Sequence, residues 1–178
     1  MRGARVAKRY ALALLELADE QNQLEQWGAE LARLAGAISA PELEEALTNP
    51  ELTEQARLEA ATKIAERLGL SFPLRSFAVV VARHGRLGIV EAISQSYQAL
   101  LDERLGRARA KLTFATQPKD SEIQRVVQAL EAASRKKVIP TVNVDDKLLG
   151  GVVAELEGKI YDASIATRLA DAEKRLSQ

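Results

Sequence analysis

The sequence predicts an α+β protein, in which an N-terminal six-helix α bundle is followed by a small α+β C-terminal domain. Apolar residues recur at helical spacing through most of the chain up to Leu105, and turn signals separate the helices. At Gly106 the period changes to two, and short alternating segments follow. We therefore expect two domains, at 1–105 and 106–178.

The composition narrows the classes of function. The 178 residues include 25 Lys+Arg and 25 Asp+Glu, and this balance disfavours a dedicated nucleic-acid binder. There is no cysteine, which excludes disulfides and thiolate metal sites. No apolar run approaches the ~20 residues that span a bilayer, so we expect any membrane role to be peripheral.

The first helix is expected at about 4–20, and its middle, 10–18, is apolar nearly all round. Such a helix needs two partners. Either it lies centrally in its own domain, which we favour, or one face receives another molecule. The second helix, at 21–39, has a single apolar stripe and packs against one surface. That stripe consists of Leu24, Trp27, Leu31, Leu34 and Ile38.

Proline, glycine and capping residues bound the next helices. A short third helix starts at Pro41, and a fourth runs from Thr53 to Gly69. A fifth is expected at 71–84, and a sixth, at 87–105, completes the bundle. The centre of the fifth is apolar on every side and includes three consecutive valines, which also suit a buried strand. The capping signals favour a helix there.

The C-terminal domain opens at 107–114 with strict alternation of basic and apolar residues. This pattern predicts an amphipathic strand with a solvated basic face, which we favour over a nucleic-acid patch. Ser121 is expected to cap a helix. A second strand is expected at 137–144, where Pro140 favours an edge position or a bulge.

The last part of the chain predicts a glycine-opened hairpin. Gly150 and Gly151 suit a bend at the entrance of a strand. Gly158 suits a tight turn before a second strand at 159–162. Ser164 is then expected to cap a final helix.

The residues show no motif for catalysis, and we expect no catalytic residue, cofactor or metal. The segment from Gly151 to Lys159 resembles a phosphate-binding P-loop only superficially, because six residues separate Gly151 from Gly158 where the motif needs four. His84 is the only histidine and precedes a glycine at a helix end. We expect it to interact with terminal carbonyls of the helix rather than to catalyse.

Two segments resemble a known family. Leu149, the pair Gly150–Gly151 and the apolar run to Gly158 are similar to the C-terminal signature of the delta subunit of F-type ATP synthases. That subunit is the counterpart of the mitochondrial oligomycin-sensitivity-conferring protein (OSCP). The opening segment 6–14 is similar to the family's first helix, and the chain length agrees. The resemblance implies a non-catalytic stalk (stator) subunit that couples proton-driven rotation to ATP synthesis.

The resemblance also implies partners. In the family, the first and fifth helices form a groove for the N-terminal helix of an α subunit, and the C-terminal domain engages the b-type stalk subunits. The residues placed in this groove, partly by helical spacing, are Val6, Tyr10, Ala13, Leu14, Leu17, Phe77, Val80, Val81 and His84. Periodicity does not decide between the two faces of the fifth helix, and Trp27 fits either the groove region or the core. The signature residues are expected to be architectural: Leu149, Gly150, Gly151 and Gly158.

Two other functions stay open, a helical adaptor for an amphipathic helix of a different partner and an enzyme of unrecognised type. The basic segment 1–9 is also typical of an organelle transit peptide. The family-like segment begins by Val6, however, so we favour a helix start. Because this leaves no room for a presequence, we expect a bacterial protein, peripheral on the cytoplasmic side of the plasma (inner) membrane.

Overall fold

The computed structural model describes residues 2–49, 52–148 and 150–162. The chain divides into two compact units, Met1–Leu101 and Asp102–Gln178, which are described separately. The division lies inside a helix, just before the limit at Gly106 that the sequence predicts. The fold is helical with one small four-stranded sheet, which confirms the α+β class.

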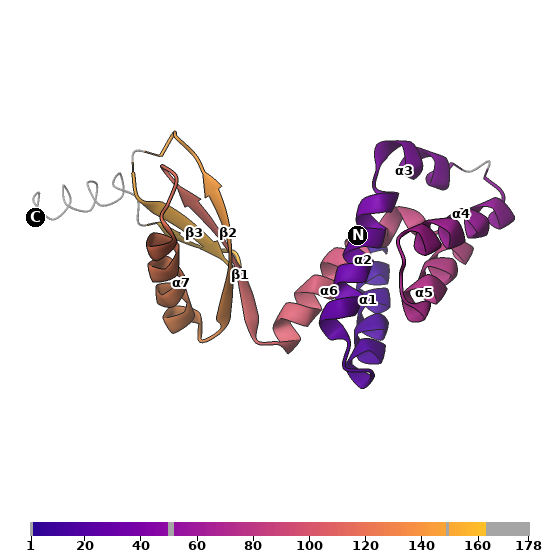
Figure 1. The fold of residues 1–178 in the computed structure, drawn as a ribbon, viewed down its shortest axis with the longest axis horizontal. Coiled ribbons are helices and arrows are strands. Elements are labelled where there is room, and N and C mark those ends of the chain that lie inside the picture. The colour runs from indigo at the N-terminus through magenta and orange to yellow at the C-terminus, as the bar shows by residue number, and fades with distance from the viewer. Residues whose placement is uncertain (1, 50–51, 149, 163–178) are drawn as a thin grey trace, which may run out of the picture. The chain divides into compact units, whose positions relative to one another are not determined.

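The first unit is built of helices (Figure 1). They are α1 (Arg2–Glu20), α2 (Leu24–Ile38), α3 (Pro41–Thr48), α4 (Glu54–Arg67), α5 (Phe72–Arg83), the 3-10 turn η1 (Leu87–Ile89) and α6 (Val90–Arg104), which continues into the second unit. The capping residues and glycines predicted from the sequence lie at several of these helix ends. The Thr53 hydroxyl accepts a hydrogen bond from the Ala56 N–H at 3.2 Å, and Gly85 after α5 has a φ of 65°. The strand alternative for the valine run is wrong, because it lies in α5.

The core of the first unit confirms the predicted stripe of α2. Trp27, Leu31, Leu34 and Ile38 are all buried, and Leu24 packs partly buried against them. The Trp27 indole N–H donates to the Gln23 side chain at 2.8 Å, so its polar atom is satisfied inside the core. Trp27 is therefore a core residue.

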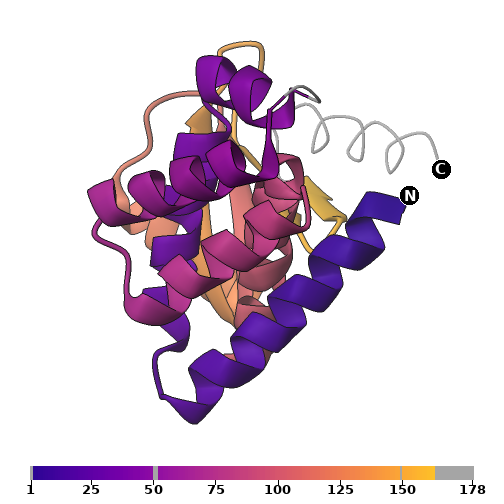
Figure 2. The same cartoon turned by 90° about the vertical axis from the view of Figure 1, so that its right-hand side faces the viewer.

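Helix α1 has both an inward and an outward apolar surface. In Figure 2 it runs obliquely across the front of the helical unit. Its inward side is buried and consists of Ala7, Ala11, Leu14, Leu15 and Ala18. On its outer surface, Leu12 and Leu17 are 44% and 50% exposed. The apolar middle of α1 thus serves the core on one side and leaves apolar side chains in solvent on the others.

The second unit is a sheet with a helix on one face (Figure 1). Its elements are β1 (Arg107–Phe114), α7 (Asp120–Ser134), β2 (Lys137–Val144), β3 (Val152–Leu156) and β4 (Lys159–Asp162). The strand order is β2-β1-β3-β4, with β1 and β2 parallel and the other neighbours antiparallel. Pro140 lies in β2 at the edge of the sheet, as its missing N–H predicts.

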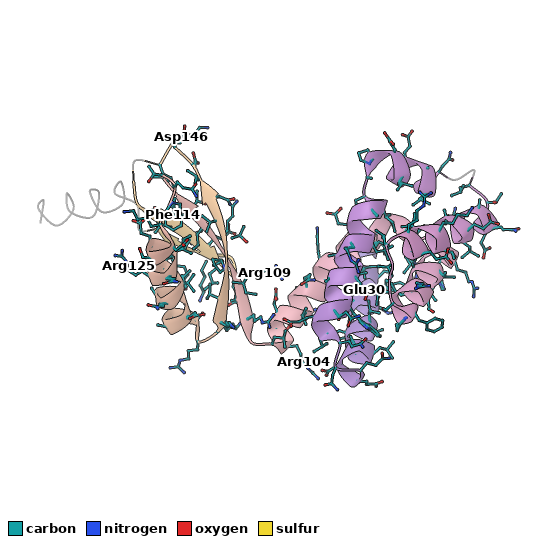
Figure 3. The ribbon with its side chains drawn as sticks, in the orientation of Figure 1. Glu30, Arg104, Arg109, Phe114, Arg125 and Asp146 are labelled. Atoms are coloured by element: carbon teal, nitrogen blue, oxygen red, sulfur yellow. The ribbon has the colours of Figure 1, made fainter. Side chains whose placement is uncertain are left out.

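Alternation in β1 sorts its residues between the two faces of the sheet. Ala108, Ala110, Leu112 and Phe114 are buried in one cluster with Leu130 of α7. Figure 3 labels Phe114 on the sheet. Helix α7 starts one residue before the predicted cap Ser121. Lys119 is its N-cap residue, and the Glu122 carboxylate accepts from the Lys119 N–H at 2.8 Å.

The signature glycines have architectural positions. Gly150 and Gly151 have φ values of 130° and 86°, and the Gly151 carbonyl accepts from the Ala115 N–H at 3.3 Å. Glu157 and Gly158 join β3 to β4 with φ values of 50° and 78°, the left-handed pair that a two-residue hairpin turn requires. Leu149 and the predicted helix after Ser164 lie outside the described residues.

Candidate functional site

The described residues contain neither a cluster of metal ligands nor a helix that could span a membrane. Among them, no group of three or more His, Asp or Glu side chains could hold a metal ion. Within the same residues, no helix is long and apolar enough to cross a membrane. The His84 Nδ1 lies 2.8 Å from the Val80 carbonyl of its own helix, which confirms the predicted contact with a terminal carbonyl.

The strongest candidate site is a hollow of about 480 Å³ between α1 and the end of α5. Its lining residues, which we call the α1–α5 groove, are Val6, Arg9, Tyr10, Ala13, His84 and Arg86. Four of these were predicted from the sequence, namely Val6, Tyr10, Ala13 and His84. The structure thus brings together residues that stand far apart in the chain.

Tyr10 is held in place at one wall of this groove. The Arg86 guanidinium donates a hydrogen bond from Nη1 to the Tyr10 hydroxyl at 2.8 Å, and its Cζ lies 5.6 Å from the centroid of the ring. The Phe77 ring meets the Tyr10 ring edge-on, with centroids 6.0 Å apart and planes at 80°. Three side chains from separate segments therefore fix one aromatic wall.

Two exposed apolar residues extend the apolar surface beside the groove. Leu17 follows Ala13 on the α1 stripe at a spacing of four, and it is 50% exposed. Val80 of α5 is 42% exposed and carries the carbonyl that His84 contacts. These residues do not line the hollow itself.

Two predicted residues do not lie on this surface. Leu14 is 3% exposed and Val81 is 0% exposed, and both belong to the core of the helical unit. Leu14 lies one residue after Ala13, about 100° around the helix, which turns it inward. In the fold described here, neither side chain reaches a molecule seated in the groove.

Sequence reasoning missed Arg9 and Arg86. Both line the groove, yet neither belongs to an apolar stripe, so helical spacing did not place them there. The dense run Arg83-His84-Gly85-Arg86 at a helix end was the available signal. It could have indicated that α5 ends in a cluster of basic side chains.

A buried carboxylate positions the other end of α5. Glu30 of α2 is 5% exposed, and its Oε2 accepts hydrogen bonds from the Ser71 N–H at 2.8 Å and the Ser71 hydroxyl at 2.7 Å (Figure 3). Gln26 donates a third bond at 3.1 Å. Burial by itself raises the pKa of Glu30, but the bonds from Ser71 and Gln26 outweigh it and hold the pKa below its ordinary value. A negative charge is therefore held at the N-terminus of α5, where the helix dipole favours it.

The open face of the sheet is polar. A shallow hollow of about 400 Å³ is lined there by Arg109, Ala110, Lys111, Thr141, Asn143, Glu155, Glu157 and Gly158. The Arg109 guanidinium forms an ion pair with Asp102, and Lys136 forms one with Glu157. Basic and acidic side chains are mixed here, which fits the solvated face that the sequence predicts for 107–114.

Comparison with known proteins gives consistent matches along the chain. The family model described as ATP synthase delta (OSCP) subunit matches residues 6–176. The "ATP synthase subunit delta" of Anaeromyxobacter sp. (strain Fw109-5) is 37% identical over 174 residues, 97% of each chain. The protein of the same name from Desulfatibacillum aliphaticivorans is 31% identical over 179 residues, 100% of this chain and 98% of that one. A chain in the Toxoplasma gondii mitochondrial ATP synthase hexamer shares the fold, with a TM-score of 0.69, 18% identity and 97% of both chains covered.

Proposed function

This chain belongs to the ATP synthase delta (OSCP) subunit family, and we propose that its α1–α5 groove binds the N-terminal helix of the synthase α subunit. It is a non-catalytic peripheral-stalk subunit of an F-type ATP synthase. In this proposal the six-helix N-terminal bundle, residues 1–105, holds the catalytic head against rotation.

The observation that carries the proposal is the pairing of a hollow with exposed apolar side chains. Val6, Tyr10 and Ala13 line one wall, and Leu17 and Val80 continue the apolar surface into solvent. An amphipathic helix laid along such a surface buries its apolar face. Covering ~600 Å² gains roughly 15 kcal/mol at ~25 cal/mol/Å², before the costs of association remove much of it. Apolar burial gives the slow dissociation that a stator needs.

We assign the second contact to the C-terminal domain, residues 106–178. Family membership supports its binding to b-type stalk subunits, so that one copy of the chain ties the head to the membrane sector. Ile160 and Tyr161 on β4 are 70% and 39% exposed, and β4 is an edge strand. These features make that side of the sheet suitable for a partner. The bacterial relatives favour a place on the cytoplasmic side of the plasma (inner) membrane.

The test of the groove is calorimetric titration of the chain with a synthetic α-subunit N-terminal peptide. We expect one-to-one binding with a negative heat-capacity change, because apolar surface is buried. Ala13→Asp and Val80→Asp each place a carboxylate against the apolar face of the peptide. We expect each to weaken binding by about 100-fold or more, the range for an unpaired buried charge.

Leu12→Asp is the matched control. Leu12 is also an exposed apolar residue of α1, at 44%, but it lies two residues from Tyr10 and so on nearly the opposite side of the helix. Its carboxylate would lie at the surface between Arg9 and Glu16 and not against the apolar face of the peptide, so we expect a loss of affinity far smaller than that of Ala13→Asp. Equal loss in all three variants, or unchanged binding in Ala13→Asp and Val80→Asp, would contradict the groove assignment. A stalk-subunit peptide that fails to bind the full chain would favour the adaptor alternative.

A further inference from the structure

The charged side chains that line the α1–α5 groove are all basic. Its lining includes Arg9, His84 and Arg86, and no acidic residue contributes to it. Arg86 already bonds the Tyr10 hydroxyl, yet a guanidinium has five N–H donors, so it can also meet a carboxylate. The groove therefore attracts anionic groups.

The opposite half of α1 carries the opposite charge. Arg5, Arg9, Glu16 and Glu20 follow one another at spacings of four, seven and four, which places them on one flank of the helix. All four are exposed. This flank borders the stripe of Val6, Ala13 and Leu17, so the surface of α1 is basic beside the groove near Val6 and acidic beyond the groove near Leu17.

The basic and acidic parts of this flank of α1 are far enough apart to act separately. Glu16 lies seven positions after Arg9, which is about 10 Å at 1.5 Å per residue. The Debye length at physiological salt is about 8 Å, so a bound charge senses mainly the nearer end. A helix whose charges match both ends binds better in one direction than in the other.

We propose that the groove selects an amphipathic helix with carboxylates in its first turns and basic residues about two turns later, and binds it parallel to α1. This inference rests on the proposed function, since it names the chemistry of the helix that the same groove receives. Acidic residues in the first turn also suit the partner's own helix dipole. The acidic start lies over Arg9 and Arg86, and the basic part lies beside Glu16 and Glu20.

The first experiment compares two synthetic peptides with the same apolar stripe. One carries the acid-first charge pattern, and in the other every charged residue is replaced by Gln. We expect the full chain to bind the charged peptide about five- to tenfold more tightly at low salt, from two or three exposed ion pairs. This ratio falls toward one at high salt. Arg9→Glu removes the preference, whereas Lys8→Glu, an exposed change on another side of α1, leaves the ratio at its wild-type value.

The second experiment reads the direction of binding. The chain has no cysteine, so a single introduced cysteine gives one possible disulfide with a peptide that carries one at its N-terminus, when dissolved oxygen oxidises the two thiols. Gly3→Cys and Gln21→Cys mark the two ends of α1, and neither changes a charge. We expect the acid-first peptide to cross-link at least about fivefold faster to the Gly3→Cys chain, because proximity sets the rate.

The outcomes separate the inference about charge and direction from the proposal that the groove binds a helix. Binding of the all-Gln peptide with no gain for the acid-first peptide, or faster cross-linking to Gln21→Cys, overturns the charge inference and leaves the groove standing. Equal cross-linking at both ends overturns the proposed direction. Failure of both peptides to bind the full chain overturns the groove together with the inference.

Discussion

Arg86 reaches across 76 residues of sequence to donate a hydrogen bond to the Tyr10 hydroxyl at 2.8 Å. The pair joins the loop after α5 to the middle of α1, and it does so at the wall of the groove. Tyr10 is partly buried, so its position depends on what packs around it. The groove is therefore preformed by contacts inside this chain.

The first prediction concerns Arg86→Ala. Losing the hydrogen bond and the guanidinium above the ring should cost about 1 kcal/mol of unfolding free energy. The released Tyr10 ring must then be ordered by the partner helix, so we expect affinity for the peptide to fall by about five- to tenfold. Urea unfolding and calorimetric titration measure the two effects.

Arg83→Ala is the control for Arg86→Ala, because Arg83 is an exposed arginine at the end of α5, three residues before Arg86, and does not line the groove. We expect it to keep the wild-type unfolding free energy within about 0.5 kcal/mol. If both substitutions lower stability equally, the Tyr10 contact does not set the position of the ring.

How far the groove could be predicted depended on whether its residues carry a local signal. The resemblance to the family placed Tyr10 and Ala13 at one wall, and helical spacing added Val6. The side of α5 was undecided because 77–82 is apolar all round, so the pattern has no direction. Packing against the rest of the unit decides it, burying Val81 and exposing Val80.

The missed residues depend on long-range contacts. Arg86 belongs to the site only because α1 passes beside the end of α5, and nothing within a few residues of Arg86 encodes that approach. The hairpin at Gly158 was predicted correctly for the opposite reason. Its turn is decided by the backbone freedom of adjacent residues. Structure that depends on neighbouring residues could thus be predicted from the sequence, whereas tertiary contacts could not.

The second prediction is a pH dependence that arises from Glu30. Its pKa in the folded chain is held below the ordinary value of 4.5, so its stabilising contribution is present above that value. The contribution is lost as the pH falls through the lowered pKa, because the folded state then takes up the proton. We expect Glu30→Gln to cost about 1–3 kcal/mol of unfolding free energy at pH 7, since the bonds from Ser71 are weakened in a buried site.

Denaturant unfolding of Glu30→Gln and wild type between pH 7 and about pH 3 checks this sign. The difference between them should shrink toward the acid side. Glu25→Gln is the control, an exposed glutamate in the first turn of the same helix. A difference for Glu30→Gln that grows on acidification would show that the Ser71 contact does not lower the pKa.

The third prediction concerns Tyr97 at alkaline pH. Burial, with a smaller contribution from the nearby Asp19 carboxylate, raises the pKa of Tyr97 to about 12. Because the pKa is raised, the stability that the protonated Tyr97 contributes is fully present below pH 10, the ordinary pKa of tyrosine. That contribution is lost as the pH rises toward 12. At pH 11 we expect wild type to have lost roughly 1 kcal/mol on this account.

Tyr97→Phe separates this titration from the hydrogen bond. The Tyr97 hydroxyl donates to the Leu24 carbonyl at 2.9 Å, so the variant should lose about 1 kcal/mol at pH 7 with this hydrogen bond. Above pH 10 its stability should fall less steeply than that of wild type, because the group that ionises is gone. Parallel pH profiles for the two proteins would mean that Tyr97 ionises as readily folded as unfolded.

The last prediction compares two glycines that differ in backbone conformation but have the same open space around them. An added Cβ meets nothing within 4 Å at Gly158 or at Gly36, so neither substitution by alanine creates a clash. Gly158 has a φ of 78°, where an L-residue is strained, while Gly36 lies inside α2. Gly158→Ala should therefore lower the unfolding free energy by about 1–2 kcal/mol, and Gly36→Ala should raise it by about 0.5–1 kcal/mol. Thermal or urea unfolding decides the signs, and a neutral Gly158→Ala would show that the β3–β4 turn adopts another conformation in solution.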